Sequence, residues 1–249
     1  MRMQTIAVIG LGQIGGSLVL AIRKNKLRYR IIGIDTSRKA LRLLSPKLDH
    51  ASTKWQEAIS ADIIFLCLHY QDAVRFLEKA PSDQLIIDVC SSKQKLVALA
   101  NRRRLRFIGG HPMCGSAMRR ENGWNDDLFR DSFFFLSRSK MSRREDQHFA
   151  EKFVRKIGGK PVLVDPSVHD RYLAATSHFP AFLSKMLSDS SQEVPDMFKG
   201  PGFRSMTRLS GTSSDLLRTF VDSNRLNILK SAKRLRTKLD DWIKTNDHR

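Results

Sequence analysis

Three glycines near the start of the chain have the spacing of a phosphate-binding loop. Gly10, Gly12 and Gly15 fit the pattern G-x-G-x-x-G in GLGQIGGSL, between a β-branched apolar run and a helical one. The first glycine allows a tight turn, the second lets the backbone approach a pyrophosphate, and the third lets helix and strand pack closely. The helix N-terminus then offers N–H groups to the phosphates. The sequence therefore predicts a dinucleotide site, in which Gln13 and Ile14 fill the variable positions.

An acidic residue at the end of the next predicted strand bears on the choice of dinucleotide. Asp35 closes the segment RIIGID, about twenty residues after Gly15. Its carboxylate would accept hydrogen bonds from a ribose 2′-hydroxyl and repel a 2′-phosphate, so NAD is favoured over NADP. Arg38 and Lys39 follow closely and weaken that preference, because cations attract a 2′-phosphate. The structural alternative is a glycine-rich turn that has lost its cofactor.

A histidine follows two glycines in FIGGHPMCGSAMRRENGW, residues 107–124. We expect Gly109, Gly110, Pro112 and Gly115 to shape a tight turn that holds His111. An imidazole changes its charge near neutral pH, which suits a group that takes up a proton in catalysis. The alternative is a His-Pro turn with a purely structural role.

The elements that must position these residues alternate along the first part of the chain. Short apolar runs predict strands over residues 4–10, 30–35, 61–68, 84–89, 106–110, 132–137 and 161–165, and a helix over 11–24. Continuous apolar strands separated by helices indicate a parallel sheet that is covered on both faces.

The strand signals stop after Asp165. Helices are predicted from Ser167 to about Asp189 and from Ser214 to about Asn246, with a Gly- and Pro-rich loop over residues 198–205 between them. The predicted fold class is α/β: a Rossmann-type, doubly wound, mostly parallel sheet domain that binds the dinucleotide, over residues 1–165. An all-helical domain for substrate binding and dimerisation is predicted to follow, over residues 166–249.

The chain is strongly basic, with 44 Lys and Arg against 25 Asp and Glu and a formal net charge of +19. The excess gathers in residues 23–30, 101–106 and 137–145. A basic surface steers anionic ligands and also occurs in nucleic-acid-binding proteins. No helix-turn-helix, RNP or zinc-finger pattern accompanies the charge, so nucleic-acid binding is the less favoured interpretation.

Composition also bears on compartment and on metals. No apolar run approaches the roughly 20 residues of a membrane span, and the start of the chain does not resemble a signal peptide. We therefore expect a cytoplasmic protein with no membrane partner. The three cysteines form no CxxC pair, so neither a disulfide framework nor a metal site is expected.

Five segments carry a family resemblance: GLGQIGGSL, DVCSSK, GGHPMCGS, HDRYLAATSHFP and GPGFRSMTR. In this order they resemble the prephenate/arogenate dehydrogenases of tyrosine biosynthesis, from Thr5 to about Leu235. The resemblance implies an oxidoreductase that converts prephenate, a dicarboxylate, to 4-hydroxyphenylpyruvate by hydride transfer to NAD, as a homodimer. The alternatives are arogenate or another cyclohexadienyl substrate, or a non-catalytic NAD- or RNA-binding relative.

The resemblance also implies catalytic residues in the first domain. His111 would accept or polarise the proton of the substrate's ring hydroxyl. Ser91, in DVCSSK, would hydrogen-bond both this hydroxyl and the histidine. Lys93 is expected to act mainly by capping and by its charge at the helix that follows it.

Substrate-binding residues are implied in the helical domain. Arg208 would bind the ring carboxylate, because a guanidinium can grip a carboxylate through two parallel hydrogen bonds. Arg204 matches a second cationic position and shares a face with Arg208 if the segment is helical. His178 would reach the substrate where Pro180 bends the helix, and a buried histidine with a core partner is the alternative.

Three positions depart from the family pattern. Ala117 replaces an acid, Ala181 replaces a second histidine, and Leu217 replaces a tryptophan. We expect all three near the substrate's side chain or the pocket gate, so they affect the choice among a pyruvyl, an alanyl or a 4-amino substituent.

Overall fold

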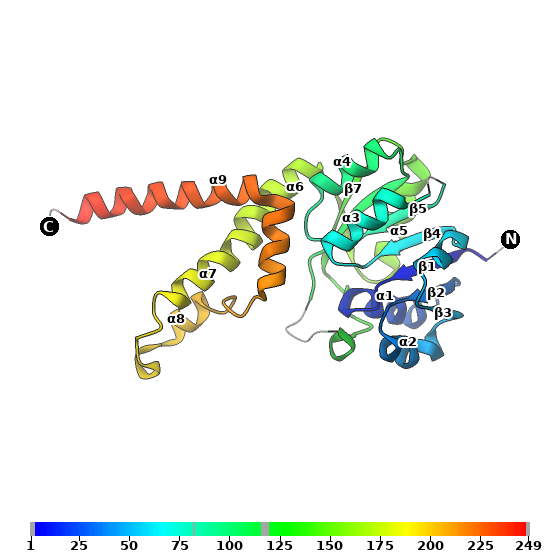
Figure 1. The fold of residues 1–249 in the computed structure, drawn as a ribbon, viewed down its shortest axis with the longest axis horizontal. Helices are drawn as coiled ribbons and strands as arrows, with labels where there is room; N and C mark the ends of the chain where they lie inside the picture. The colour runs from blue at the N-terminus through cyan, green and yellow to red at the C-terminus, as the bar shows by residue number, and fades with distance from the viewer. Residues whose placement is uncertain (1–2, 82, 116–119, 248–249) are drawn as a thin grey trace. The chain divides into compact units, whose positions relative to one another are not determined.

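The computed structural model describes residues 3–81, 83–115 and 120–247. The chain divides into two compact units, residues 1–166 and 167–249, each with its own core (Figure 1). The described residues contain no helix that is both long enough and apolar enough to span a bilayer.

One sheet organises the first unit, in the strand order β3-β2-β1-β4-β5-β6-β7-β8. The strands described are β1 (Thr5–Ile9), β2 (Arg30–Ile34), β3 (His50–Ser52), β4 (Ile63–Leu66), β5 (Leu85–Asp88), β6 (Phe107–Pro112), β7 (Phe133–Arg138) and β8 (Lys160–Leu163). Neighbours are parallel except β6 and β7, which pair antiparallel. The chain builds outward from β1 to β2 and β3, then returns to β4 on the other side. The crevice between β1 and β4 is therefore the switch point at which such sheets bind ligands.

Both faces of this sheet are buried, as the apolar strands predict. In β1, Ile6 and Val8 belong to one core, and Ala7 and Ile9 belong to the other. The first core is covered by α1 (Gln13–Lys24), α2 (Arg38–Leu44) and α5 (Arg144–Lys156), and the second by α3 (Tyr70–Lys79) and α4 (Gln94–Arg102). The predicted fold class is confirmed. β3 was missed because its three residues are exposed or half-buried and lack an apolar run.

The first predicted helix of the second unit is interrupted. The structure has α6 (Pro166–Leu173), a π-helical turn (Ala174–His178) and α7 (Phe179–Asp189). Pro180 has no N–H and cannot donate to the carbonyl that a regular helix would give it. The wider turn directly before it accommodates the missing bond.

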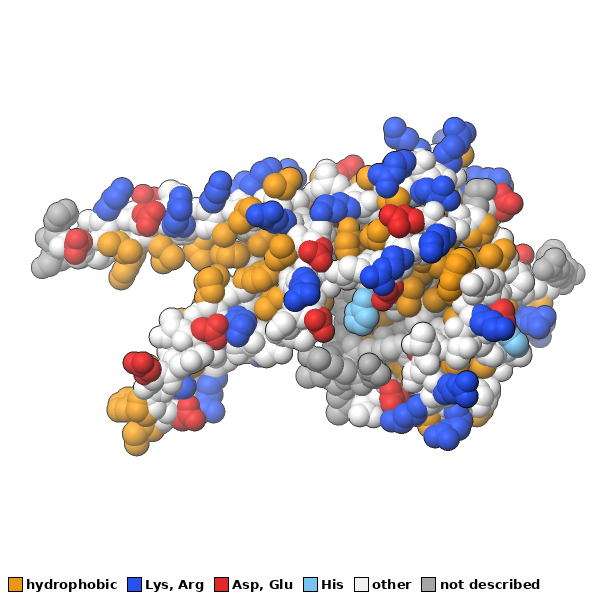
Figure 2. Space-filling model, in the orientation of Figure 1, with side chains coloured by type: hydrophobic (Ala, Val, Ile, Leu, Met, Phe, Trp, Pro, Cys, Tyr) orange, Lys and Arg blue, Asp and Glu red, His pale blue; other side chains and the backbone are white. Residues whose placement is uncertain are grey.

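The predicted loop over residues 198–205 is wrong, because most of it is helical. A 3₁₀ turn (Asp196–Phe198) leads into α8 (Pro201–Met206), where Pro201 takes the first helical position that proline favours. The last helix, α9 (Ser214–Asn246), is confirmed, with a kink at Asn224 (φ −138°). Hydrophobic side chains gather along one side of α9 and Lys and Arg along the other (Figure 2).

Candidate active site

The glycine-rich loop after β1 adopts the tight turn that its spacing predicts. Gly10 has a φ of +91°, and a Cβ there would lie 2.4 Å from the carbonyl oxygen of Cys67. A Cβ on Gly15 would lie 1.9 Å from the carbonyl oxygen of Gly10. A side chain at Gly10 would therefore push the loop away from the end of β4, and one at Gly15 would push α1 away from the loop.

Gly12 leaves space at the N-terminus of α1. It is the N-cap residue, without a side chain to cap the helix, and a Cβ there would meet no described atom within 4 Å. Gln13 and Ile14 begin α1. The first N–H groups of a helix lack partners within the helix and attract anions. The space beside Gly12, which a Cβ would partly fill, lies at the N-terminus of α1. This space fits a pyrophosphate.

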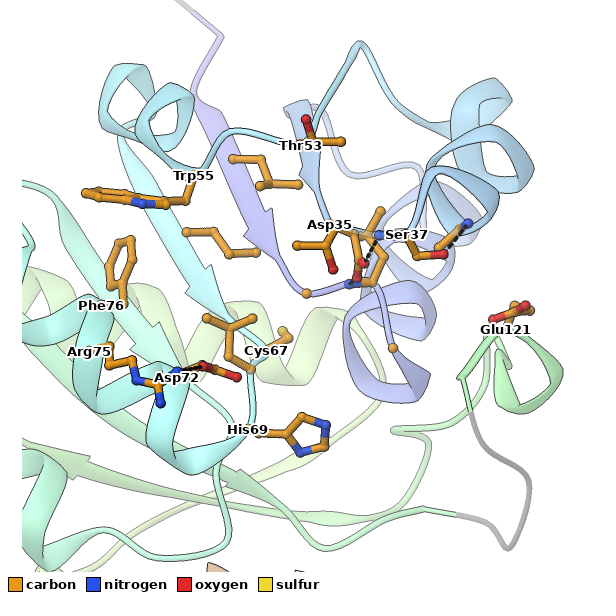
Figure 3. A pocket seen from close by; sticks show the side chains of 18 of the residues that line it. Asp35, Ser37, Thr53, Trp55, Cys67, His69, Asp72, Arg75, Phe76 and Glu121 are labelled. Carbon is orange, nitrogen blue, oxygen red and sulfur yellow. Dashed lines mark hydrogen bonds and ion pairs between the residues drawn. The ribbon is translucent and has the colours of Figure 1, made fainter. Parts of the chain in front are cut away.

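A cavity of about 600 Å³ opens beside this loop. Gly10, Gly12 and Asp35 line it, whereas Gln13, Ile14 and Gly15 do not. Trp55 and Phe76 form an apolar wall, with ring centroids 5.5 Å apart and planes at 77° (Figure 3). A slot with apolar walls and a few placed polar groups is typical of a cofactor site.

Asp35 is fixed in this cavity by the backbone. One carboxylate oxygen accepts the N–H of Leu11 at 2.6 Å, and the other accepts the N–H of Ser37 at 2.7 Å. Each oxygen keeps a further lone pair with which it can accept a hydroxyl. The half-buried carboxylate therefore fits the role of binding ribose hydroxyls.

The rim of the cavity carries residues that the sequence did not place there. Glu121 lines the cavity, and its Oε1 lies 2.5 Å from Nζ of Lys39 on α2. His69, the N-cap residue of α3, also lines it (Figure 3). No local pattern signals these positions, because segments far apart in sequence build the rim.

The turn expected around His111 is instead part of a strand. β6 continues through Pro112, and His111 lies opposite Phe135 of antiparallel β7. The ladder between β5 and β6 ends two residues before His111, at the pair formed by Asp88 and Gly109. His111 is thus held by a paired strand at the carboxyl edge of the parallel sheet, where ligands bind in such folds.

Ser91 follows the adjacent strand, β5. It is half-buried, and its side chain makes no hydrogen bond with His111 or any other residue that the structure describes. The expected capping role of Lys93 is wrong. Lys93 is the N-cap residue of α4, but its side chain is buried against Asp88 and does not cap the helix.

His178 lies in the π-helical turn and is fully buried. Its ring stacks on Phe220 with centroids 4.2 Å apart, and Nδ1 accepts the Nδ2–H of Asn224 at 3.2 Å. Among the described residues, Nε2 has no partner. Burial lowers the pKa of His178 to about 4, so the ring is neutral and Nε2 carries the proton.

The two predicted substrate arginines do not share a helix. Arg204 lies in α8 and donates from Nε to the carbonyl oxygen of Lys199 at 2.9 Å. Arg208 lies beyond the C-cap residue Thr207, so the helical condition for a shared face is not met. Arg208 is exposed and makes no side-chain hydrogen bond or ion pair with any described residue.

Both units match the domains of one protein family. The profile of the prephenate dehydrogenase nucleotide-binding domain matches residues 18–163, and that of the prephenate dehydrogenase dimerization domain matches residues 165–248. The chain belongs to the prephenate dehydrogenase family. The resemblance noted in the sequence is thereby confirmed.

Individual relatives agree with this assignment. The chain is 31% identical to the prephenate dehydrogenase of Bacillus subtilis (strain 168), over 98% of this chain and 68% of that protein. Its fold is similar to that of prephenate dehydrogenase from A. aeolicus in complex with hydroxyphenyl propionate and NAD+, with a TM-score of 0.88, 21% identity, and 100% and 93% of the two chains covered. It is also similar to Synechocystis arogenate dehydrogenase, with a TM-score of 0.82, 26% identity, and 98% and 93% covered.

Two departures from the family pattern lie in the core of the helical unit. Ala181 on α7 and Leu217 on α9 are buried in one apolar cluster with Ala174, Phe220 and Ile228. They pack helix against helix, and Phe220 of the same cluster stacks on the ring of His178. Their expected place near the substrate's side chain or the pocket gate stays a prediction. Ala117 lies outside the described residues.

The three cysteines are free, and their thiols are protonated at neutral pH. Burial raises the pKa of Cys67 and Cys90 well above the usual range and that of Cys114 to about 12. Within the described part of the chain, His, Cys, Asp and Glu form no group of three or more that could hold a metal ion.

Proposed function

We propose that the protein catalyses the NAD-dependent oxidative decarboxylation of prephenate to 4-hydroxyphenylpyruvate, in tyrosine biosynthesis. The observation that carries the proposal is that both domains of the prephenate dehydrogenase family match the chain, from residue 18 to residue 248. The space beside Gly12 and Asp35 supports a dinucleotide cofactor in the first of these domains.

The chain's own groups favour NAD over NADP. The fixed carboxylate of Asp35 accepts ribose hydroxyls and repels a 2′-phosphate. Lys39, which could attract that phosphate, is paired with Glu121. When bound, NAD supplies the acceptor for the hydride of the ring carbon, whose oxidation lets the ring carboxylate leave as carbon dioxide while the ring becomes aromatic.

His111 takes the proton of the ring hydroxyl as general base in this proposal. Its place at the carboxyl end of β6, paired with β7, supports the role, because a group held on a strand keeps its geometry better than one on a loop. Ser91, at the adjacent strand end, would hydrogen-bond the same hydroxyl.

The helical unit supplies the groups that bind the carboxylates. Arg208 is the better candidate, because its guanidinium is not engaged by any described residue, whereas Arg204 already donates to a backbone carbonyl. His178 would donate from Nε2 to the substrate, since this buried atom has no partner among the described residues.

Arogenate is the second candidate substrate, supported by the likeness to Synechocystis arogenate dehydrogenase. The two substrates share the ring and differ in the side chain, which is a pyruvyl group in prephenate and an alanyl group in arogenate. The proposed roles of His111 and Ser91 are therefore the same for both.

We also propose a homodimer that works in the cytoplasm. The match of residues 165–248 to a dimerization domain supports the dimer, as do exposed apolar residues on α9 such as Leu226 (75% exposed) and Trp242 (64% exposed). The free cysteines are in keeping with a reducing compartment. A monomer mass at micromolar concentration, by light scattering, would contradict the dimer.

The deciding experiment is NADH absorbance with purified protein, prephenate and NAD, repeated with NADP and with arogenate. We expect rapid NADH formation with prephenate. His111→Asn should lower kcat about 10²- to 10⁴-fold without changing the Kd of NADH. Equal activity in this variant would remove the proposed mechanism, and activity with arogenate alone would change the substrate but keep the mechanism.

A further inference from the structure

A completely buried ion pair binds the backbone of Gly110, the residue that precedes His111. Asp88 ends β5 and Lys93 precedes α4, and both side chains have no exposed surface. Nζ of Lys93 lies 2.6 Å from each carboxylate oxygen of Asp88 and 2.6 Å from the carbonyl oxygen of Gly110. The three N–H groups of an ammonium match these three acceptors.

The same carboxylate holds two backbone N–H groups. Oδ1 of Asp88 accepts from Gly110 at 3.0 Å, and Oδ2 accepts from Cys90 at 2.8 Å. Gly110 directly precedes His111, and Cys90 directly precedes Ser91. The pair therefore fixes the backbone next to both residues proposed to contact the substrate's hydroxyl.

The ion pair binds the backbone of β6 just beyond the end of the β5–β6 ladder. The β5–β6 ladder ends at Asp88 and Gly109, so Gly110 has no strand partner on that side. There the side chains of Asp88 and Lys93 bind its N–H and C=O in place of a strand. On the other side, His111 pairs with Phe135 of β7.

The two glycines before the histidine make room for this arrangement. A Cβ on Gly109 would lie 2.9 Å from Cδ of Lys93. A Cβ on Gly110 would lie 2.5 Å from the carbonyl oxygen of Asp88 and 2.8 Å from the ring of Phe134. The missing side chain of Gly109 thus leaves space for Lys93, and that of Gly110 lets β6 approach the end of β5.

Stability alone gives little reason for such a pair. Burying two charges is expensive, and replacing a buried ion pair with apolar residues is often neutral or stabilising. Apolar side chains could fill the space, but they could not hold the N–H and C=O of Gly110 or the N–H of Cys90.

We propose that Asp88 and Lys93 are positioning residues for the reaction, which set the geometry of His111 and Ser91 through the backbone of Gly110 and Cys90. The kinetic part of the inference rests on the proposed function. A displacement of about 1 Å of a catalytic group can cost about 100-fold in rate. Loss of the pair should therefore lower kcat while the cofactor cavity, which is built on other strands, keeps its affinity.

The test is the double variant Asp88→Asn/Lys93→Met, which removes both charges together. We expect a folded protein by circular dichroism, a kcat lowered about 10- to 100-fold, and a Kd of NADH and a KM within about twofold of wild type. A folded double variant with wild-type kcat overturns the proposal.

Arg106 and Asp146 provide a matched control at the other end of β6. Nη2 of Arg106 lies 2.5 Å from Oδ1 of Asp146, whose side chain is 3% exposed. Arg106→Met/Asp146→Asn removes this pair and should lower the melting temperature without lowering kcat. Equal losses of kcat in both double variants would mean that the Asp88–Lys93 effect is only structural, and would overturn the proposal.

Two further measurements cover the remaining cases. If the double variant does not fold, the near-isosteric Asp88→Asn takes its place, with the same expected loss of kcat and the same contrary result. If wild type forms no NADH from either substrate, the proposed function fails. The positioning role is then tested by the ring-proton NMR signals of His111. These signals are assigned by their absence from the spectrum of His111→Asn. Altered signals in the variant support the positioning role, and unchanged signals overturn it.

Discussion

The indole Nε1 of Trp124 lies 3.0 Å from the carbonyl oxygen of Gly12, so a residue from beyond β6 is bonded to the phosphate-binding loop. The same N–H group lies 3.1 Å from the carbonyl oxygen of Leu11. Gly16 makes room for the indole, because a Cβ there would lie 2.0 Å from Nε1. The loop's shape therefore depends on a contact more than a hundred residues away in sequence.

Trp124→Phe should weaken NADH binding. Phenylalanine keeps most of the aromatic packing but leaves the two loop carbonyls without their donor, and a lost hydrogen bond of about 1 kcal/mol corresponds to about a fivefold higher Kd. The fluorescence of bound NADH measures this Kd. Trp242→Phe, on an exposed part of α9, is the matched control and should bind as wild type does. An unchanged Kd in Trp124→Phe would show that the bond does not shape the loop.

Glu121→Gln should reduce the preference for NAD over NADP. The substitution removes a negative charge from the cavity rim and releases Lys39, which can then attract a 2′-phosphate. An ion pair at the protein surface contributes up to about 1 kcal/mol, so we expect the ratio of the NADP Kd to the NAD Kd to fall about threefold. Titration of both nucleotides gives the ratio, with Glu145→Gln on α5 as control. A ratio that stays constant or rises would exclude Glu121 as a selectivity residue.

Arg208→Gln should mainly raise KM for the substrate. The change removes a carboxylate contact present in both the bound and the transition state, so kcat should change little while KM rises about 10- to 100-fold. Arg204→Gln should have a smaller effect, because the Arg204 guanidinium also binds the carbonyl of Lys199. Arg218→Gln, an exposed arginine of α9, is the control in steady-state assays. A wild-type KM in Arg208→Gln would show that Arg208 does not bind the substrate's carboxylate.

Stability should fall as the pH drops from 6.5 towards 4, in part through His178. The pKa of this residue is about 4 in the folded protein, against 6.5 for an ordinary histidine, because burial disfavours the charged ring. Between these values the unfolded chain binds a proton that the folded protein excludes, so the free energy of unfolding decreases on acidification. The contribution is about 2 kcal/mol between pH 7.5 and pH 5.

Urea unfolding of wild type and His178→Asn at these two pH values isolates this contribution. The loss of stability on acidification should be about 2 kcal/mol smaller in the variant. His148→Asn, which alters an exposed histidine of α5, should lose as much stability as wild type. Equal pH dependence in all three proteins would show that His178 is not held neutral by burial.

Elements with local signals could be predicted from the amino-acid sequence. The spacing of Gly10, Gly12, Gly15 and Asp35 is read over a few turns of chain, and the apolar strands are read over a few residues each. The φ of Gly10 and the closeness of Gly15 to that loop follow from these patterns. The long helix α9 was likewise predicted from the residues of its own segment, and the structure confirms it over Ser214–Asn246.

Contacts between segments that are distant in sequence could be seen only in the folded protein. GGHP reads as a turn from its residues, yet it is a strand, because β7 supplies an antiparallel partner for His111. From the sequence, Asp88 falls inside a predicted strand and Lys93 is expected to cap a helix, yet the two side chains bind each other and Gly110, because the sheet brings β6 beside β5. These outcomes depend on contacts between segments far apart in sequence. The energies of such contacts cannot be predicted from the local pattern of apolar and polar residues.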